Sequence, residues 1–192
     1  MAETTSTTNV SKFSSRIAKT GLASPNKFEV VFTKIPGLSS GGKERLNLMC
    51  DQCSLAGRNV QATLDLQYGI RRQVVYNGAE YTPLSLSFIC TDNMNEKRIL
   101  DKWNNKCVNT TGNFHVAYYD DYVGHLDVYV LDRSGKKRTY HMHYHEVYPK
   151  TVTAVELNHG TTNASLRVTA EIQYAYWSTS DIWAPGGTHG QG

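Results

Sequence analysis

The stretch YTPLSLSFICTDNMNEKRILDKWNNKCV, residues 81–108, combines a strand pattern with the one clear helix pattern of the chain. Over residues 84–88 leucine and phenylalanine alternate with serine, as in a strand with one buried face. The sequence from Asn93 to Glu96 then resembles a capping box, and apolar residues follow with helical spacing up to Cys107. Each large apolar side chain buried here contributes about 1.5–3 kcal/mol. We therefore predict a strand and a helix that pack together.

Alternating patterns elsewhere indicate about six more strands. Asn77-Gly78 is typical of a two-residue hairpin turn, and the Gly-rich and Ser-rich segment 36–43 is typical of a loop. The segments with a strand pattern are residues 27–35, 46–50, 59–76, 83–90, 125–133, 137–148 and 165–176. The predicted fold is mainly β, an antiparallel β-sandwich or partly closed barrel with one flanking α-helix.

The chain divides into a central domain and two polar ends. Its 192 residues fit one domain with a substantial core. Residues 1–24 are predicted to form an arm that becomes ordered only against a partner, and residues 25–177 to form the β domain. Residues 178–192, which include Pro185-Gly186-Gly187, are predicted to be a flexible tail.

Composition argues against several functions. A net charge of +3 without a clustered basic face gives no case for a nucleic-acid-binding protein. The polar N-terminal residues contain neither a secretory signal nor a membrane-spanning segment. We therefore expect a cytosolic setting with reduced cysteines, and the pair Cys50 and Cys53 is interpreted as core or boundary thiols.

The most chemistry-like motif is His141-Met142-His143-Tyr144-His145, which places three imidazoles on one face of a strand. Alternate residues of a strand lie about 6–7 Å apart, so three in a row rarely converge on one metal ion. The adjacent acids Asp120-Asp121 are interpreted as part of a solvated loop. Phosphate-binding loops, nucleophile elbows and dinucleotide motifs are absent from the sequence. We therefore predict no catalytic residue, no metal and no cofactor.

Polar residues alternate with the expected core residues on two strands. In residues 59–67 and 165–176 one set is apolar, while the other carries Gln, Thr, Asp, Arg and Glu. The simplest interpretation is a sheet face in contact with solvent. The alternative is that several subunits join these faces into one ring-wide barrel with a polar channel, which would also remove exposed sheet edges.

The order of these motifs resembles the T4-like tail tube proteins of contractile-tailed bacteriophages. The resemblance covers roughly residues 10–177 and rests on order and spacing. Its components are Ser24-Pro25-Asn26-Lys27-Phe28-Glu29-Val30, the alternating segment 59–76, the Asn77-Gly78 turn, Leu84-Ser85-Leu86-Ser87-Phe88, the helix ending near Lys102-Trp103, and the closing strand Leu166 to Trp177.

This resemblance implies a structural subunit of homo-hexameric rings that stack into a tube in the virion tail. The implied partners are sheath, baseplate and tape-measure proteins, with transient passage of double-stranded DNA and assembly in the host cytoplasm. Residues expected to face the lumen are Gln61, Thr63, Asp65, Gln67, Arg71, Gln73, Arg167, Thr169, Glu171 and Gln173. Residues expected at contacts between rings are Phe13, Ile17, Leu38, Lys43 and Arg45.

Four alternatives remain open at the level of sequence. A paralogous baseplate or terminator ring, or the tube of a secretion system, would share the pattern and differ in self-polymerisation. A metal-dependent β-barrel enzyme would use His141, His143 and His145. A sugar-binding sandwich would use Tyr118, Tyr119 and Tyr122.

Overall fold

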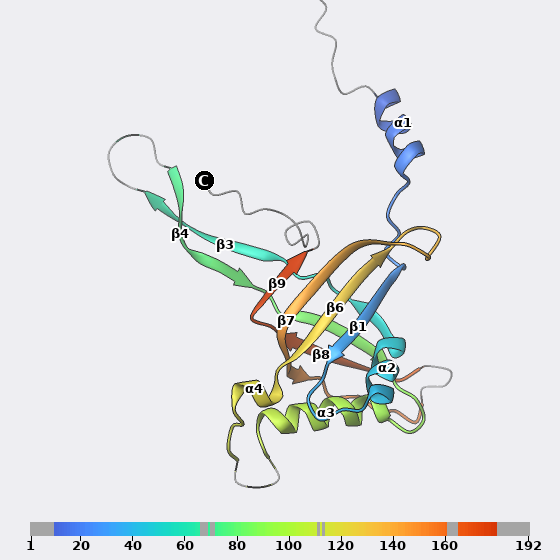
Figure 1. Ribbon diagram of the computed structural model, residues 1–192, viewed down its shortest axis with the longest axis vertical. Helices are drawn as coiled ribbons and strands as arrows, with labels where there is room; N and C mark the ends of the chain where they lie inside the picture. The colour runs from blue at the N-terminus through green and yellow to red at the C-terminus, as the bar shows by residue number, and fades with distance from the viewer. Residues whose placement is uncertain are drawn as a thin grey trace, which may run out of the picture.

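The computed structural model describes residues 10–65, 69, 72–110, 112, 114–160 and 165–179 (Figure 1). The strands are β1 Phe28–Lys34, β2 Cys50–Cys53, β3 Arg58–Asp65, β4 Arg72–Tyr81, β5 Leu84–Ile89, β6 Gly124–Leu131, β7 Arg138–Val152, β8 Arg167–Gln173 and β9 Tyr176–Thr179. The helices are α1 Val10–Thr20, α2 Ser40–Met49, α3 Asn95–Cys107 and α4 Tyr119–Tyr122.

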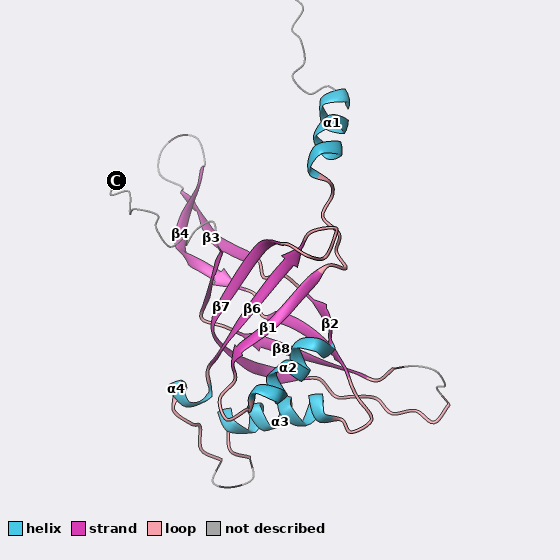
Figure 2. Cartoon of the chain, turned by 45° about the vertical axis from the view of Figure 1, so that its right-hand side comes forward, coloured by secondary structure: helices cyan, strands magenta, loops and turns pink. Residues whose placement is uncertain are grey.

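The body is a folded-over antiparallel sheet in the order β1-β6-β7-β8-β5-β2, with β9 also paired to β7. We call β1, β6, β9 and the part of β7 paired to them sheet A, and β2, β5, β8 and the end of β7 sheet B. Figure 2 shows the two layers with α2 and α3 at one end. The predicted mainly β, antiparallel class is confirmed, and the described strands do not close into a barrel.

Strand β7 joins the layers because it changes partner along its length. Residues up to Val147 pair with β6, and residues from Tyr148 pair with β8. The change occurs beside Glu146, which has a left-handed φ of 55°. Pro149 lies inside β7 opposite Ile172, next to a register irregularity, so the strand does not end at residue 148 as expected. Proline is tolerated at such irregular positions.

The core lies between the layers and beneath α3. Gly124 is required where β6 begins, because a Cβ there would overlap the carbonyl of Lys34 and crowd the indole of Trp103. The buried apolar residues include Val30, Phe32, Leu84, Leu86, Phe88, Leu100, Trp103, Leu126, Val128, Met142, Tyr144, Val168, Ala170 and Ile172.

The strand and helix predicted from residues 81–108 are both present. Trp103 is 2% exposed, and its indole N–H donates to the carbonyl of Tyr122 at 2.8 Å. The start of α3 differs from a simple capping box. Met94 is the N-cap, and Glu96 accepts hydrogen bonds from the backbone N–H and the hydroxyl of Thr91 instead of reaching Asn93.

The segment between β1 and β2 is a second flanking helix, which corrects the predicted loop at 36–43 and strand at 46–50. Leu46 and Leu48 suggest alternation, but Leu46 is fully buried while Leu48 is 79% exposed. In α2 the side chain of Asn47 accepts a hydrogen bond from the N–H of Phe32 at 2.8 Å. The helix thus covers the core beside β1 and satisfies a strand amide, which the spacing of two leucines does not reveal.

Two smaller boundaries also differ from prediction. Asn77-Gly78 lies within β4, where the register shifts between the pairs Val60↔Ala79 and Ala62↔Val75, so it forms a bulge instead of the hairpin turn. The connection between β3 and β4 falls between Asp65 and Arg72. Strand β9 continues to Thr179, two residues into the predicted tail; residues 180–192 and 1–9 lie outside the described residues.

Candidate functional site

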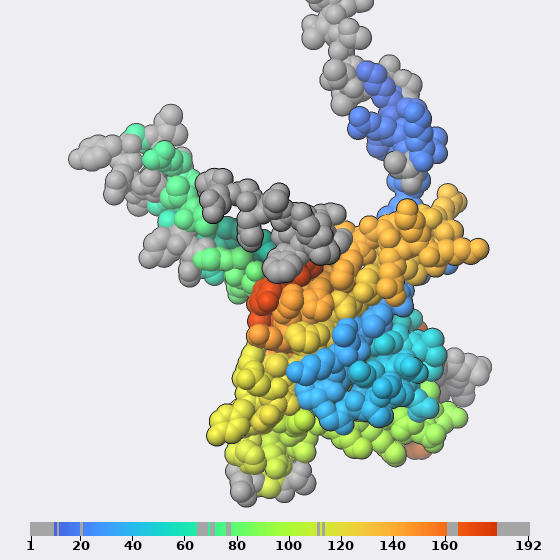
Figure 3. Space-filling model, viewed as in Figure 1, coloured from blue at the N-terminus to red at the C-terminus, as the bar shows by residue number. Residues whose placement is uncertain are grey.

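The β3–β4 hairpin projects from the body (Figure 3), and several of its apolar side chains are exposed. Val60, Leu64, Val74 and Val75 are 48, 43, 42 and 69% exposed. Val60, Leu64 and Val75 lie on the dry face that the alternating sequence predicts, whereas Val74 lies on the opposite face beside Thr63. No described part of the chain covers the dry face. A two-stranded hairpin is at best marginally stable alone, so this surface calls for a partner.

The register of the hairpin changes which predicted lumen residues share a face. Leu64 pairs with Gln73 and Thr63 with Val74, so odd positions of β4 lie beside even positions of β3. The expectation that Gln73 shares a face with Gln61 and Thr63 is therefore wrong. A period-two count that runs from β3 into β4 assumes a straight chain, whereas a hairpin connection resets the alternation. Gln67 and Arg71 lie outside the described residues, as does the side chain of Asp65.

Aromatic contacts fix the root of the hairpin to the body. The guanidinium of Arg58 lies 4.8 Å from the centre of the Trp177 ring and 5.7 Å from that of Tyr81. The rings of Tyr81 and Tyr174 meet edge to face at 5.8 Å, and the Tyr174 hydroxyl donates to the carbonyl of Thr82 at 2.7 Å. The hairpin is therefore held where it leaves the body and is uncovered beyond that point.

Sheet B has a polar outer face built on β8. Arg167, Thr169, Glu171 and Gln173 alternate with buried residues of the core, as predicted. Ser85 and Ser87 lie opposite Glu171 and Thr169 on β5, beside a small cavity of about 220 Å³. The sequence did not reveal the partner of Arg167, which is Asp51, at 2.8 Å from its Nε. This pairing reduces the positive charge of the face.

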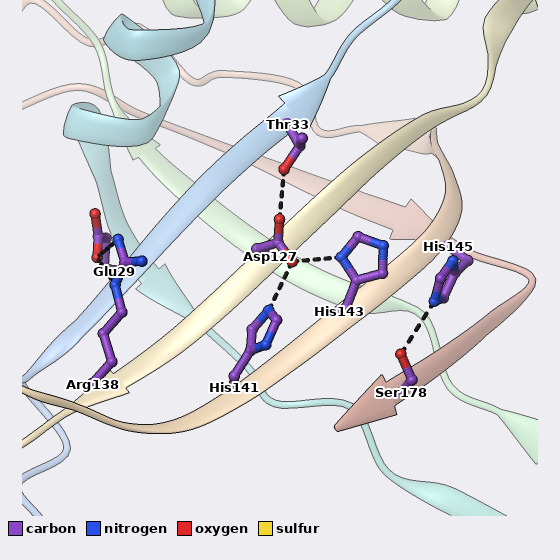
Figure 4. Close-up of polar contacts among 8 residues, drawn as sticks. All are labelled: Glu29, Thr33, Asp127, Arg138, His141, His143, His145 and Ser178. Atoms are coloured by element: carbon purple, nitrogen blue, oxygen red, sulfur yellow. Dashed lines mark hydrogen bonds and ion pairs between the residues drawn. The ribbon is translucent and has the colours of Figure 1, made fainter. Parts of the chain in front are cut away.

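Sheet A carries the histidines on its outer face, which Figure 4 shows. Because β6 pairs with β7 in the register His125↔His145 and Asp127↔His143, two more polar residues join the predicted row. His141 Nε2 and His143 Nδ1 both lie against Oδ1 of Asp127, at 2.8 and 2.5 Å. A carboxylate only accepts, so both nitrogens carry protons. We call His125, Asp127, His141, His143 and His145 the histidine cluster.

Burial and hydrogen bonds set the ionisation of the cluster. Burial disfavours the charged form of Asp127 and by itself would raise the pKa of this carboxyl. Hydrogen bonds from Thr33, His143 and His141 outweigh burial and hold the pKa below its usual value. Burial, followed by the nearby His143, lowers the pKa of both His125 and His145. The cluster therefore holds one carboxylate beside imidazoles, two of which resist protonation.

The residues predicted for ring contacts fall into two groups. In α1, Phe13 is 67% exposed and Ile17 is half-buried, on a helix that projects from the body (Figure 1). Leu38, by contrast, packs against the core, and Lys43 donates to the carbonyl of Thr33 at 3.1 Å. Arg45 is exposed on α2. The segment around α2 therefore has a packed structure in the single chain.

An apolar cavity of about 430 Å³ opens beside the start of β1. It lies where the connection from α1 enters the body, and the carbon-rich side chains of Phe28, Leu55, Val128 and Val130 line it together with Pro25. A recess of this kind fits one or two apolar side chains and suits contact with another chain better than polar chemistry.

Neither the paired cysteines nor the neighbouring tyrosines form a reactive or sugar-binding site among the described residues. Burial raises the pKa of both Cys50 and Cys53 to about 12, which leaves them as unreactive thiols. Neither of the two metal-compatible groups found there includes a cysteine. Tyr119 and Tyr122 pack edge to face at 5.5 Å and so do not form a flat platform for a sugar ring beside Tyr118.

Comparisons with known proteins agree with this geometry. The chain resembles a subunit of a contractile injection system sheath–tube complex (13% identity, TM-score 0.59, covering 90% of this chain and 97% of that one). It also resembles a subunit of an anti-feeding prophage tube-terminating cap (11%, 0.58, 93% and 98%) and of the six-fold symmetrised baseplate of that particle (13%, 0.58, 82% and 95%). These likenesses show a shared fold.

A comparison with curated protein sequences finds no significant match. Among the described helices, none has the length and apolar character needed to cross a membrane. The family model described as "Phage tail tube protein" matches residues 23–180, which include both sheets, the hairpin and α3. The chain therefore belongs to the phage tail tube protein family and is a structural subunit of a tube.

Proposed function

We propose that this chain forms homo-hexameric rings that stack into the tube of a contractile phage tail. The observation that carries the proposal is the projecting β3–β4 hairpin, whose apolar residues have no cover among the residues that the structure describes. A neighbouring subunit that continues the sheet would bury these residues and remove the exposed strand edges at once. Six copies joined in this way would form the ring-wide barrel, and the six-fold baseplate with the same fold supports the number.

The proposed lumen is lined by the polar face of β8 together with the hairpin. A conduit for double-stranded DNA has to avoid holding it, since each phosphate contact slows sliding and adds salt-dependent affinity. The ion pair of Arg167 with Asp51, beside an exposed Glu171, supports a face with little attraction for phosphate. As a tube subunit, the chain would surround the passing genome and tape-measure protein. It would also contact the sheath and the baseplate.

The proposed setting is the virion tail, assembled in the host cytoplasm, and the proposed role is non-enzymatic. Contacts between stacked rings are assigned to α1, whose exposed Val10 and Phe13 lie on an amphipathic helix with no cover in the described chain. The apolar cavity beside β1 is of a size to receive such side chains from a second copy. In both the α1 contact and the cavity contact, the proposed partner is a second copy of this chain.

Electron microscopy of the purified chain over a concentration series tests the tube. We expect hollow six-fold tubes for the wild-type protein and dispersed subunits for Val75→Asp, because assembly would bury the new carboxylate unpaired. The matched control is Val116→Asp, at a valine that is 68% exposed outside the hairpin, which should still assemble. Tubes formed equally well by Val75→Asp would contradict the proposed use of the hairpin.

A second candidate is a terminator or baseplate ring, because the cap and baseplate subunits match as well as the subunit of the sheath–tube complex does. Such a ring would form single hexamers that do not stack at any concentration. The same microscopy separates the two roles: long tubes support the major tube subunit, and isolated rings support the capping role.

A further inference from the structure

Three imidazoles converge on the outer face of sheet A from two different strands. One ring nitrogen from each of His125, His143 and His145 lies within 4.8 Å of one from each of the others. The ring centres are 4.2, 5.7 and 6.0 Å apart. Three imidazoles bound to one tetrahedral ion at about 2.0–2.1 Å would have centres roughly 5 Å apart. The ring centres therefore lie within about 1 Å of the spacing expected in a metal site.

Each of the three rings has a nitrogen available for a metal. His143 donates its Nδ1 proton to Asp127, which leaves the lone pair on Nε2. His145 contacts Ser178 through Nε2 at 3.2 Å, which leaves Nδ1. His125 Nδ1 is buried and has no hydrogen-bond partner among the described residues. A buried polar atom without a partner calls for an explanation, and a bound ion is one.

The neighbours of these rings are those expected around a metal ion. Metal-binding histidines commonly hold a carboxylate or another acceptor with the nitrogen that faces away from the ion. Asp127 does this for His143, and Ser178 is placed to do so for His145. Asp127 and Glu146 supply negative charge near His125, while Lys34 supplies the opposing positive charge.

A second compact group consists of Asp127, His141 and His143. Its facing ring nitrogens are already engaged in hydrogen bonds and are not available to an ion. There the two ring nitrogens already direct their protons at one carboxylate oxygen. An ion at that point would have to displace both hydrogen bonds. We propose that His125, His143 and His145 bind one divalent transition-metal ion of the Zn²⁺ type, a function separate from tube assembly.

Calorimetric titration of ZnCl₂ into the full chain, purified without a polyhistidine tag and stripped of metal, tests this site. We expect one Zn²⁺ per chain, and the Co²⁺ form should show the visible absorption of a tetrahedral ion. His125→Ala and His145→Ala should each abolish saturable binding. Ser178→Ala, which removes an outer partner, should weaken binding about 10–100-fold.

Matched variants keep the test specific. His115→Ala and His159→Ala change exposed histidines outside the cluster and should bind Zn²⁺ as the wild type does. His141→Ala should also retain binding, because His141 belongs only to the second group. Circular dichroism of every variant checks folding. Absence of saturable binding to the wild type, or binding lost in His141→Ala and kept in His125→Ala, would overturn the proposal.

Discussion

The body of the molecule and the β3–β4 hairpin share the same alternating sequence pattern, but their apolar side chains differ in burial. In β8 the apolar residues Val168, Ala170 and Ile172 are all fully buried, whereas Val60 and Leu64 of β3 are nearly half exposed. The body supplies its own second layer, and the hairpin has none within the described chain. Period-two alternation therefore predicts that a face will be dry but does not predict which chain will cover it.

The largest effect is expected in the body. Trp103→Ala should lower the free energy of unfolding by about 3–5 kcal/mol, because it removes a buried indole packed edge to face on Phe32 at 6.0 Å. Urea unfolding of the dispersed chain measures this. Trp103→Phe keeps most of the ring and should cost clearly less. A loss below about 1 kcal/mol for the alanine variant would mean that the core does not stabilise the body within the single chain.

The next effect depends on pH and lies at the start of α3. Burial alone would raise the pKa of Glu96, but hydrogen bonds from Thr91 and from its own backbone N–H lower it below the usual value. Stability gained from the ionised group is therefore present at neutral pH and is lost as the pH falls through the lowered pKa. Glu96→Gln should cost about 1.5–3 kcal/mol at pH 7.

Acidification provides the check on that prediction. The difference in unfolding free energy between the wild type and Glu96→Gln should shrink as the pH falls through the lowered pKa of Glu96, where the wild-type carboxylate also becomes protonated. Glu44→Gln, at an exposed acid on α2, is the control and should show little difference at any pH. A gap between Glu96→Gln and the wild type that stays unchanged over the whole acid titration would contradict the assignment.

A smaller effect is expected where the two regions meet. Arg58→Ala removes the cation–π contacts with Trp177 and Tyr81, worth roughly 0.5–1 kcal/mol at an exposed site. Tryptophan fluorescence should change because the charge over Trp177 is lost. Arg58→Lys should restore part of the effect, since a lysine ammonium also attracts the ring. Identical behaviour of Arg58→Ala and the wild type would show that the root is fixed by other contacts.

The smallest effect on the single chain is expected in the hairpin itself. Val75→Asp should change the unfolding free energy of the dispersed chain by no more than about 0.5 kcal/mol, because the side chain is 69% exposed there. Its large effect should appear only in assembly. Denaturant unfolding below the assembly concentration measures the first quantity. A loss of 2 kcal/mol or more would indicate that the hairpin is already packed in the monomer.

The elements that the sequence predicted well depend on local periodicity. The strand at Leu84–Phe88 and the helix through Trp103 were identified because their residues set both the period and the buried face. Helix α2 was missed because only Leu46 is buried, and its stabilising bond from Phe32 to Asn47 joins residues that no spacing rule connects. A single buried side chain leaves the period undetermined.

Only part of the candidate site can be predicted from the sequence, because alternation within one strand does not reveal which residues lie opposite on the next strand. The β8 face follows from alternation within one strand. The histidine cluster requires the register of β6 against β7, which places His125 opposite His145 and Asp127 opposite His143. Three histidines on one strand do not converge, and it is the residue on the neighbouring strand that closes the group. Likewise Asp51 becomes the partner of Arg167 only through tertiary packing.

Hydrogen exchange measured on dispersed subunits and on assembled tubes compares the two regions most directly. Amides of β5 and β8 should be protected in both states, because their partners lie in the same chain. Amides of β3 and β4 should exchange rapidly in the dispersed subunit and become protected on assembly. If the hairpin amides exchange at the same rate in both states, its apolar residues are not covered by a neighbouring subunit, and the central claim is contradicted.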